Sequence, residues 1–162
     1  MNAGGLRARP TPAGVPVIDL SQATVLPDLI DAHPHMFNNR QPGQSTEQAM
    51  LIAVQNAQAD LRAGFTSVRD MTSHGNGYGD VAIRDAIRQG RFDGPRYQVS
   101  TLGIVWGAEP AKGPQNPLAS TVVRTVDEAK AAVRDQISHG ADGITLYPTG
   151  PYPVSPERKR VG

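Results

Sequence analysis

Apolar residues recur with helical spacing in three segments of the chain. The first and third segments open with Ser45 and Thr125, each followed three residues later by a glutamine or glutamate, which is the spacing of a capping box. Asp80 is expected to cap the second helix, and a glycine closes each segment, as is common at helix C-termini. The pattern therefore predicts three amphipathic helices, at 45–64, 80–90 and 125–140.

Short apolar runs rich in β-branched residues alternate with these helices. Strands are predicted at 26–37, 65–71, 96–105 and 141–147. Strand–helix alternation is typical of right-handed βαβ units, so the fold class is α/β with a parallel sheet. Two further strand-like pieces, 17–20 and 23–26, are expected to form a hairpin that leads into the first strand.

The end of the first predicted strand carries two histidines in a His-x-His pattern. Alternate residues of a strand share a face, so Asp31, His33 and His35 are expected to point to the same side and to converge. Pro34 favours an extended conformation at the residue before it. Imidazole nitrogen suits zinc and related ions, and we predict that His33 and His35 bind a divalent metal, expected to be zinc, in preference to a chance pairing.

Connections that leave the predicted strands are long, whereas those that leave the helices are short. In parallel α/β folds the functional groups gather at the C-terminal ends of the strands, where His33 and His35 lie. His74, in a glycine-rich loop at the same end, is a candidate for substrate contact, although an ordinary loop histidine is favoured. Asp31 is a candidate either to orient one of the histidines or to bond to a nearby loop. No catalytic residue is assigned.

Composition narrows the classes of function. The 162 residues include no cysteine, which excludes disulfides, thiolate metal sites and cysteine nucleophiles. A formal net charge of +1 without a dominant basic block disfavours nucleic acid and an anionic membrane as partners. The chain has neither a signal-like N-terminus nor an apolar window of membrane-spanning length, so a cytoplasmic protein is expected.

Three stretches resemble the amidohydrolase superfamily of metal-dependent hydrolases, most of all its imidazolonepropionase-like and prolidase-like branch. They are 17–35, which is similar to the family's LPGLIDAHTH pattern, 65–70 together with 85–87, and 140–146. The resemblance implies a truncated (β/α)8 barrel of the TIM type, with about four parallel strands, three helices and a remnant of a small N-terminal β segment. The expected division is a flexible N-terminus and short β segment at 1–25, a partial barrel at 26–150 and a disordered polar tail at 151–162.

The resemblance also implies a chemistry. His33 and His35 match the family's first pair of metal ligands, and the implied reaction is hydrolysis of an amide, cyclic amide or dipeptide C–N bond by a metal-activated water. The expected substrate is a small amide or peptide. Thr145 stands where the family usually has a lysine that bridges two metals.

The alternative reading is a catalytically inactive half barrel with at most a binding role. Its open edge predicts self-association. Because the tail after Gly150 does not resemble the family, we expect a truncated or frame-shifted reading frame.

Overall fold

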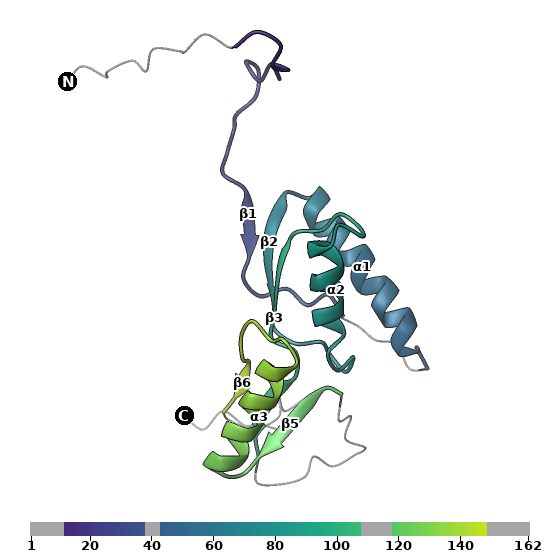
Figure 1. Ribbon diagram of the computed structural model, residues 1–162, viewed down its shortest axis with the longest axis vertical. Helices are drawn as coiled ribbons and strands as arrows, with labels where there is room; N and C mark the ends of the chain where they lie inside the picture. Colours follow the sequence, from purple (N-terminus) through teal and green to yellow (C-terminus); the bar gives the residue numbers. More distant parts are fainter. Residues whose placement is uncertain (1–11, 38–42, 108–117, 149–162) are drawn as a thin grey trace, which may run out of the picture.

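The computed structural model describes residues 12–37, 43–107 and 118–148. All four strand pairs are parallel, in two three-stranded sheets with the orders β1-β2-β3 and β5-β4-β6. Figure 1 shows α1 and α2 beside the first sheet and α3 beside β5 and β6. The elements are β1 (Leu29–Asp31), α1 (Thr46–Arg62), β2 (Phe65–Asp70), α2 (Gly79–Arg88), β3 (Arg96–Val99), β4 (Gly103–Trp106), β5 (Ser120–Val123), α3 (Val126–Ser138) and β6 (Leu146–Tyr147).

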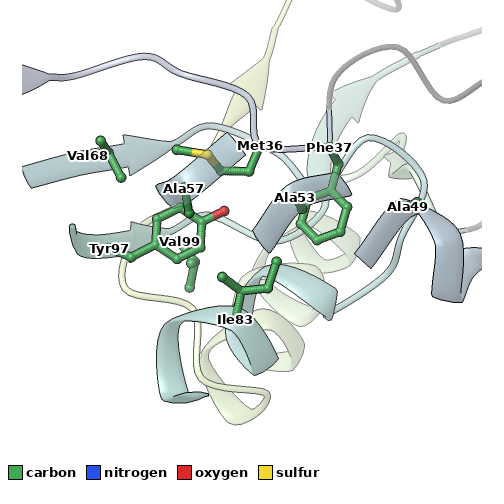
Figure 2. Packing of buried hydrophobic residues seen from close by; sticks show 9 residues of the cluster. All are labelled: Met36, Phe37, Ala49, Ala53, Ala57, Val68, Ile83, Tyr97 and Val99. Carbon is green, nitrogen blue, oxygen red and sulfur yellow. The ribbon is translucent and has the colours of Figure 1, made fainter. Parts of the chain in front are cut away.

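The larger core lies between the first sheet and the helices α1 and α2 (Figure 2). Helix α1 contributes three buried alanines spaced four residues apart, a small-residue stripe that lets the helix approach the sheet closely. Side chains from α2, β2, β3 and the segment after β1 fill the remaining space. The buried members of this core are Met36, Phe37, Ala49, Ala53, Ala57, Val68, Ile83, Tyr97 and Val99.

The three predicted helices are confirmed. At the start of α1, the Ser45 hydroxyl accepts from the Gln48 amide, and the Gln48 side chain accepts from the Ser45 amide, which completes the capping box. Only half of this arrangement forms at α3, where Thr125 accepts from the Glu128 amide while the Glu128 side chain bonds to the amide of Arg124. None of the helices in the described ranges is long and apolar enough to cross a membrane.

The prediction that Asp80 caps α2 is wrong. The N-cap residue is Tyr78, and Asp80 lies within the first turn of the helix with its side chain fully buried. One carboxylate oxygen of Asp80 accepts from the Thr101 amide at 2.8 Å and the other accepts from the Val81 amide. Asp80 therefore bonds to the corner after β3 as well as to its own helix.

The predicted strand at 96–105 is two strands, β3 and β4, which belong to different sheets. The chain turns between them at Thr101, which has a φ of 55°, in the left-handed region that non-glycine residues seldom adopt. Strand β5 was not predicted, since its short run follows a proline-rich loop. It gains its stability from parallel pairing with β4, which is a contact between distant parts of the sequence.

The predicted hairpin at 17–26 is absent from the described structure, which has only a turn there, with the Ala23 amide bonded to the Leu20 carbonyl. Val17, Ile18, Val25 and Leu26 are each more than 70% exposed, so no sheet covers them. A two-stranded ribbon without a packing partner is marginal at best. The predicted tail at 151–162 and residues 1–11 of the predicted flexible N-terminus at 1–25 lie outside the described residues.

A buried arginine connects α2 to the segment before β6. The guanidinium of Arg84 bonds to the Asp142 carboxylate at 2.9 Å and to the Gly140 carbonyl. Asp142 in turn accepts from the Val99 amide, and the amides of Asp142 and Gly143 both donate to the Val99 carbonyl. These bonds join the two sheets at the end of β3 and set the position of β6.

Candidate functional site

The histidine pair lies just beyond β1. This strand is shorter than predicted and ends at Asp31, so strand alternation does not place His33 and His35. Two anchors place them instead. Met36 and Phe37 are buried in the core directly after His35, and the Asn56 side chain of α1 donates to the Met36 carbonyl at 2.8 Å.

Three imidazole rings lie side by side at this end of the first sheet. The ring centroids of His33 and His35 are 5.0 Å apart, and those of His35 and His74 are 4.3 Å apart, with both pairs edge to face. His74 comes from the loop between β2 and α2, so two distant segments supply the three rings. The structure therefore brings together all three histidines that the sequence placed at this end of the sheet.

Asp31 bonds to the adjacent loop, which is the second of its two predicted roles, and does not orient a histidine ring directly. Its carboxylate accepts from the His33 backbone amide at 2.9 Å, which closes a turn just after the strand. Asp31 therefore shapes the backbone that carries the histidines, and no direct bond from its side chain to either imidazole is found among the described residues.

Asp70, at the end of β2, lies beneath the His35 ring, and its side chain is fully buried. The Tyr97 hydroxyl donates to this carboxylate, as do the amides of Met36 at 3.4 Å and Thr72 at 3.3 Å. The Nδ1 atom of His35 lies 3.8 Å from Asp70, which is too long for a hydrogen bond. That nitrogen is buried and has no hydrogen-bond partner in the described structure.

The surroundings favour neutral side chains. The pKa of His35 is lowered to about 4, mainly by burial and also by the neighbouring His74 and His33, against a smaller opposite effect of Asp31. Burial also lowers the pKa of His74. For Asp70, burial raises the pKa to about 7, although the bond from Tyr97 opposes the shift. At neutral pH the His35 and His74 rings are thus uncharged, the state in which an imidazole nitrogen can bind a metal.

A cavity of about 650 Å³ opens in front of the histidines. Its walls come from the segments after β1 and β2 and from β4, β5 and β6, so both sheets contribute. Thr145, at the position where a lysine was expected by resemblance, lines this cavity and donates from its hydroxyl to the Met71 carbonyl at 2.6 Å. The lining residues are His33, His35, Met71, Thr72, His74, Val105, Ala119, Ser120, Thr145, Leu146 and Tyr147.

Residues suited to a metal are present, but they are not gathered into a complete site. Within the described ranges, no three histidine, cysteine, aspartate or glutamate side chains form a group that could hold an ion as they stand. His33 and His35 offer two imidazoles in contact, and both line the cavity, with Nδ1 of His35 buried on the side of Asp70. The donor chemistry therefore fits a divalent metal for two of its ligands.

The Asp70–Tyr97 pair and the hydroxyl residues of the far wall were not predicted as parts of the site. The position of Asp70 near the end of a predicted strand was the only sequence signal that it belongs to the site. Tyr97 cannot be distinguished in the sequence from an ordinary aromatic residue of the core. Ser120 and Thr72 approach the histidines only through the pairing of the strands and carry no local pattern.

Comparison with known proteins agrees with this geometry. The sequence model of the amidohydrolase family matches residues 24–158, which is eight residues beyond the point where the resemblance was expected to end. A search of curated proteins finds no match.

Solved structures with the same fold include an amidohydrolase (29% identity, TM-score 0.70), a prolidase complexed with N-methylphosphonate-L-proline (27%, 0.67) and a Xaa-Pro dipeptidase with bound methionine in its active site (30%, 0.62). The alignments cover 88%, 87% and 74% of this chain, respectively. They cover only 40%, 40% and 33% of those proteins, so the chain corresponds to part of a barrel. On the family match over most of its length, this chain belongs to the amidohydrolase family.

Proposed function

We propose that this chain carries the first part of a metal-dependent hydrolase site that acts on C–N bonds. The observation that supports the proposal is the pair of touching imidazoles of His33 and His35 at the mouth of the 650 Å³ cavity, in a chain of the amidohydrolase family. Its metal is a divalent ion, and we propose zinc because the two available ligands are imidazole nitrogens.

The proposed site has residues that hold the metal ion and residues that receive the substrate. His33 and His35 hold the ion, and the core packing of Met36 keeps His35 in place. When bound, such an ion lowers the pKa of its water and polarises an amide carbonyl. The cavity walls receive the substrate: Met71, Val105 and Leu146 offer apolar surface, and the Thr72 and Ser120 side chains add hydroxyl groups.

For the substrate we propose a small amide or dipeptide. Two of the similar structures are described as a prolidase and a Xaa-Pro dipeptidase. A cavity of 650 Å³ is within the usual range for pockets that take ligands of this size. Its lining combines apolar side chains with imidazoles and a few hydroxyl groups, which suits a small molecule with an amide bond and an apolar side chain.

The proposal is tested with the full chain, stripped of metal with a chelator and reloaded with zinc. We expect hydrolysis of Xaa-Pro dipeptides or N-acyl amino acids above the uncatalysed rate, lost on chelation and restored by zinc. Zinc content is measured on the same samples. Full zinc occupancy without hydrolysis would contradict the enzymatic proposal and favour the second candidate below.

The second candidate is a catalytically inactive half barrel that acts through binding. It is favoured by Thr145, whose hydroxyl bonds to the Met71 carbonyl inside the cavity and cannot replace a bridging carboxylated lysine. Edge strands and apolar side chains left in water also favour this candidate. Strands β1 and β6 each end a sheet, and Ile30 and Leu146 on them are 69% and 61% exposed.

Self-association through these edges is the partner interaction we propose for an inactive half barrel. We expect the purified chain to form dimers or larger species at micromolar concentration, because unpaired parallel edges and exposed apolar side chains promote association. Ile30→Lys and Leu146→Lys should each shift the chain towards monomer, as measured by size-exclusion chromatography with light scattering.

Leu51→Lys provides a matched control for the edge variants, since Leu51 is 68% exposed on α1, away from either sheet edge. It should leave the oligomeric state unchanged. A monomeric parent chain, or an equal response to all three lysines, would overturn the proposal.

A further inference from the structure

We propose that His74 supplies the third nitrogen ligand to the metal ion held by His33 and His35. This inference rests on the proposed metal site and adds a residue from a different loop. It is carried by the structure of the loop, by the backbone conformation of His74 and by the contact between its ring and that of His35.

Within the loop between β2 and α2, the residues on either side of His74 are buried. Thr72, Ser73 and residues 75–77 are all buried, whereas His74 is exposed. The His74 side chain lines the cavity that His33 and His35 also line. The loop thus presents a single imidazole to the cavity.

Hydrogen bonds hold this loop on both sides of His74. The Ser73 amide donates to the Thr101 carbonyl at 2.9 Å, and the Ser73 hydroxyl bonds to the Gly77 carbonyl. On the other side, the Asn76 amide donates to the Ser73 carbonyl and the Gly77 amide donates to the Leu118 carbonyl. The backbone of His74 is therefore set by its neighbours, independently of its own side chain.

That backbone is unfavourable for histidine. His74 has a φ of 46°, in the left-handed region that glycine and asparagine tolerate best. Three other positions in the loop, Gly75, Asn76 and Gly77, carry glycine or asparagine, so a less strained residue type is common there. Strained non-glycine residues that the surrounding structure enforces are found disproportionately at functional sites. The presence of a histidine at this position is therefore not explained by the loop backbone and points to a role of its side chain.

The spacing of the His33 and His35 rings matches a shared ion, and the His74 ring lies against that of His35. Two imidazoles on one tetrahedral zinc have centroids about 5 Å apart, given Zn–N bonds of about 2.0–2.1 Å. The centroids of His33 and His35 are 5.0 Å apart, and those of His35 and His74 are 4.3 Å apart. The three rings do not form a metal group as they stand, so binding requires the exposed His74 ring to turn about its side-chain bonds.

No other side chain among the described lining residues offers an equivalent ligand. Among the described residues of the cavity wall, the remaining polar side-chain groups are hydroxyls and none is a carboxylate. Asp70 lies beneath His35, but its oxygens already accept from Tyr97 and from backbone amides. Three imidazoles with an open fourth position make a known type of catalytic zinc site.

The test compares His74→Asn with His139→Asn in the full chain. Asparagine tolerates a positive φ, so His74→Asn keeps the loop while it removes the imidazole. His139, at the C-terminal end of α3, does not line the cavity and provides the same substitution elsewhere. Affinity for Co²⁺ and Zn²⁺ is measured by titration, with the visible absorption of Co²⁺ as a report of ligand number.

We expect His74→Asn to weaken Co²⁺ and Zn²⁺ binding by at least about tenfold and to change the Co²⁺ spectrum, while the melting temperature of the metal-free chain stays the same or rises. His139→Asn should leave metal affinity unchanged. Unaltered affinity and spectrum in His74→Asn would overturn the role of His74 while the His33–His35 site stands. A lower melting temperature without a change in affinity would assign His74 a structural role, and no binding by the parent chain would overturn both proposals.

Discussion

Replacement of both His33 and His35 by alanine should abolish measurable zinc binding by the chain. Loss of even an outer partner of a metal ligand costs about 10–100-fold in affinity, so removal of two direct ligands should lower it by at least about a hundredfold. Affinity is measured by competition with a chromophoric chelator, and bound zinc is counted by elemental analysis.

Folding should survive this double substitution, which makes the result interpretable. His33 is exposed, and the His35 side chain retains 23% of its exposure and makes no hydrogen bond through Nδ1. The metal-free variant should therefore melt close to the metal-free parent. His139→Ala serves as the control, because His139 lies outside the cavity. If the double variant bound zinc as tightly as the parent, the metal would be held elsewhere and the proposed site would be wrong.

Asp80→Ala is expected to cause a large loss of stability. Asp80 is fully buried, and its carboxylate is the acceptor for the Thr101 amide at the corner between the two sheets. Its removal leaves a buried amide without a partner and a small void. We expect the free energy of unfolding to fall by about 2–4 kcal/mol at pH 5, as measured by urea denaturation.

The cost of Asp80→Ala should depend on pH. Burial raises the pKa of Asp80 to about 6, while bonds from the Thr101 and Val81 amides oppose the shift. Because the folded chain holds this proton more tightly than the unfolded chain, the contribution of Asp80 is complete below pH about 4 and declines as the pH rises through 6.

The difference in unfolding free energy between the parent and Asp80→Ala should accordingly shrink between pH 4.5 and 7.5. Comparison of the two chains at each pH cancels the opposite contribution of His35, whose pKa is lowered. Leu51→Ala, at an exposed position of α1, should show little cost at any pH. A cost that grows with pH would mean that the folded chain favours ionised Asp80.

Both sheets of this chain contribute to the candidate site. His33, His35 and His74 are supplied by the first two strand–loop units, and β4, β5 and β6 supply the opposite wall of the cavity. The similar structures are more than twice as long as the part they share with this chain. Experiments on metal binding test the histidine cluster, whereas experiments on association test the exposed sheet edges. They address separate properties of this chain.

The sequence by itself determined the helices and the fold class. Helix α1 forms where the apolar period and the Ser45–Gln48 capping box predicted it, because both signals arise from interactions within about one turn. The alternation of strands and helices sufficed to predict a parallel α/β arrangement, since few topologies suit that order. The His-x-His pattern predicted a metal site at the end of the first strand, and that site remains a proposal.

Only the tertiary structure decided how these parts meet. The chain leaves β3 and enters a second sheet at Thr101 because Asp80, 21 residues earlier, and Asp142, 43 residues after Val99, bond to that corner. His74 meets His35 because the Thr101 carbonyl and Leu118 hold its loop. Such contacts join residues far apart in the chain and leave no periodic trace, so local pattern could predict the elements but not the cavity they enclose.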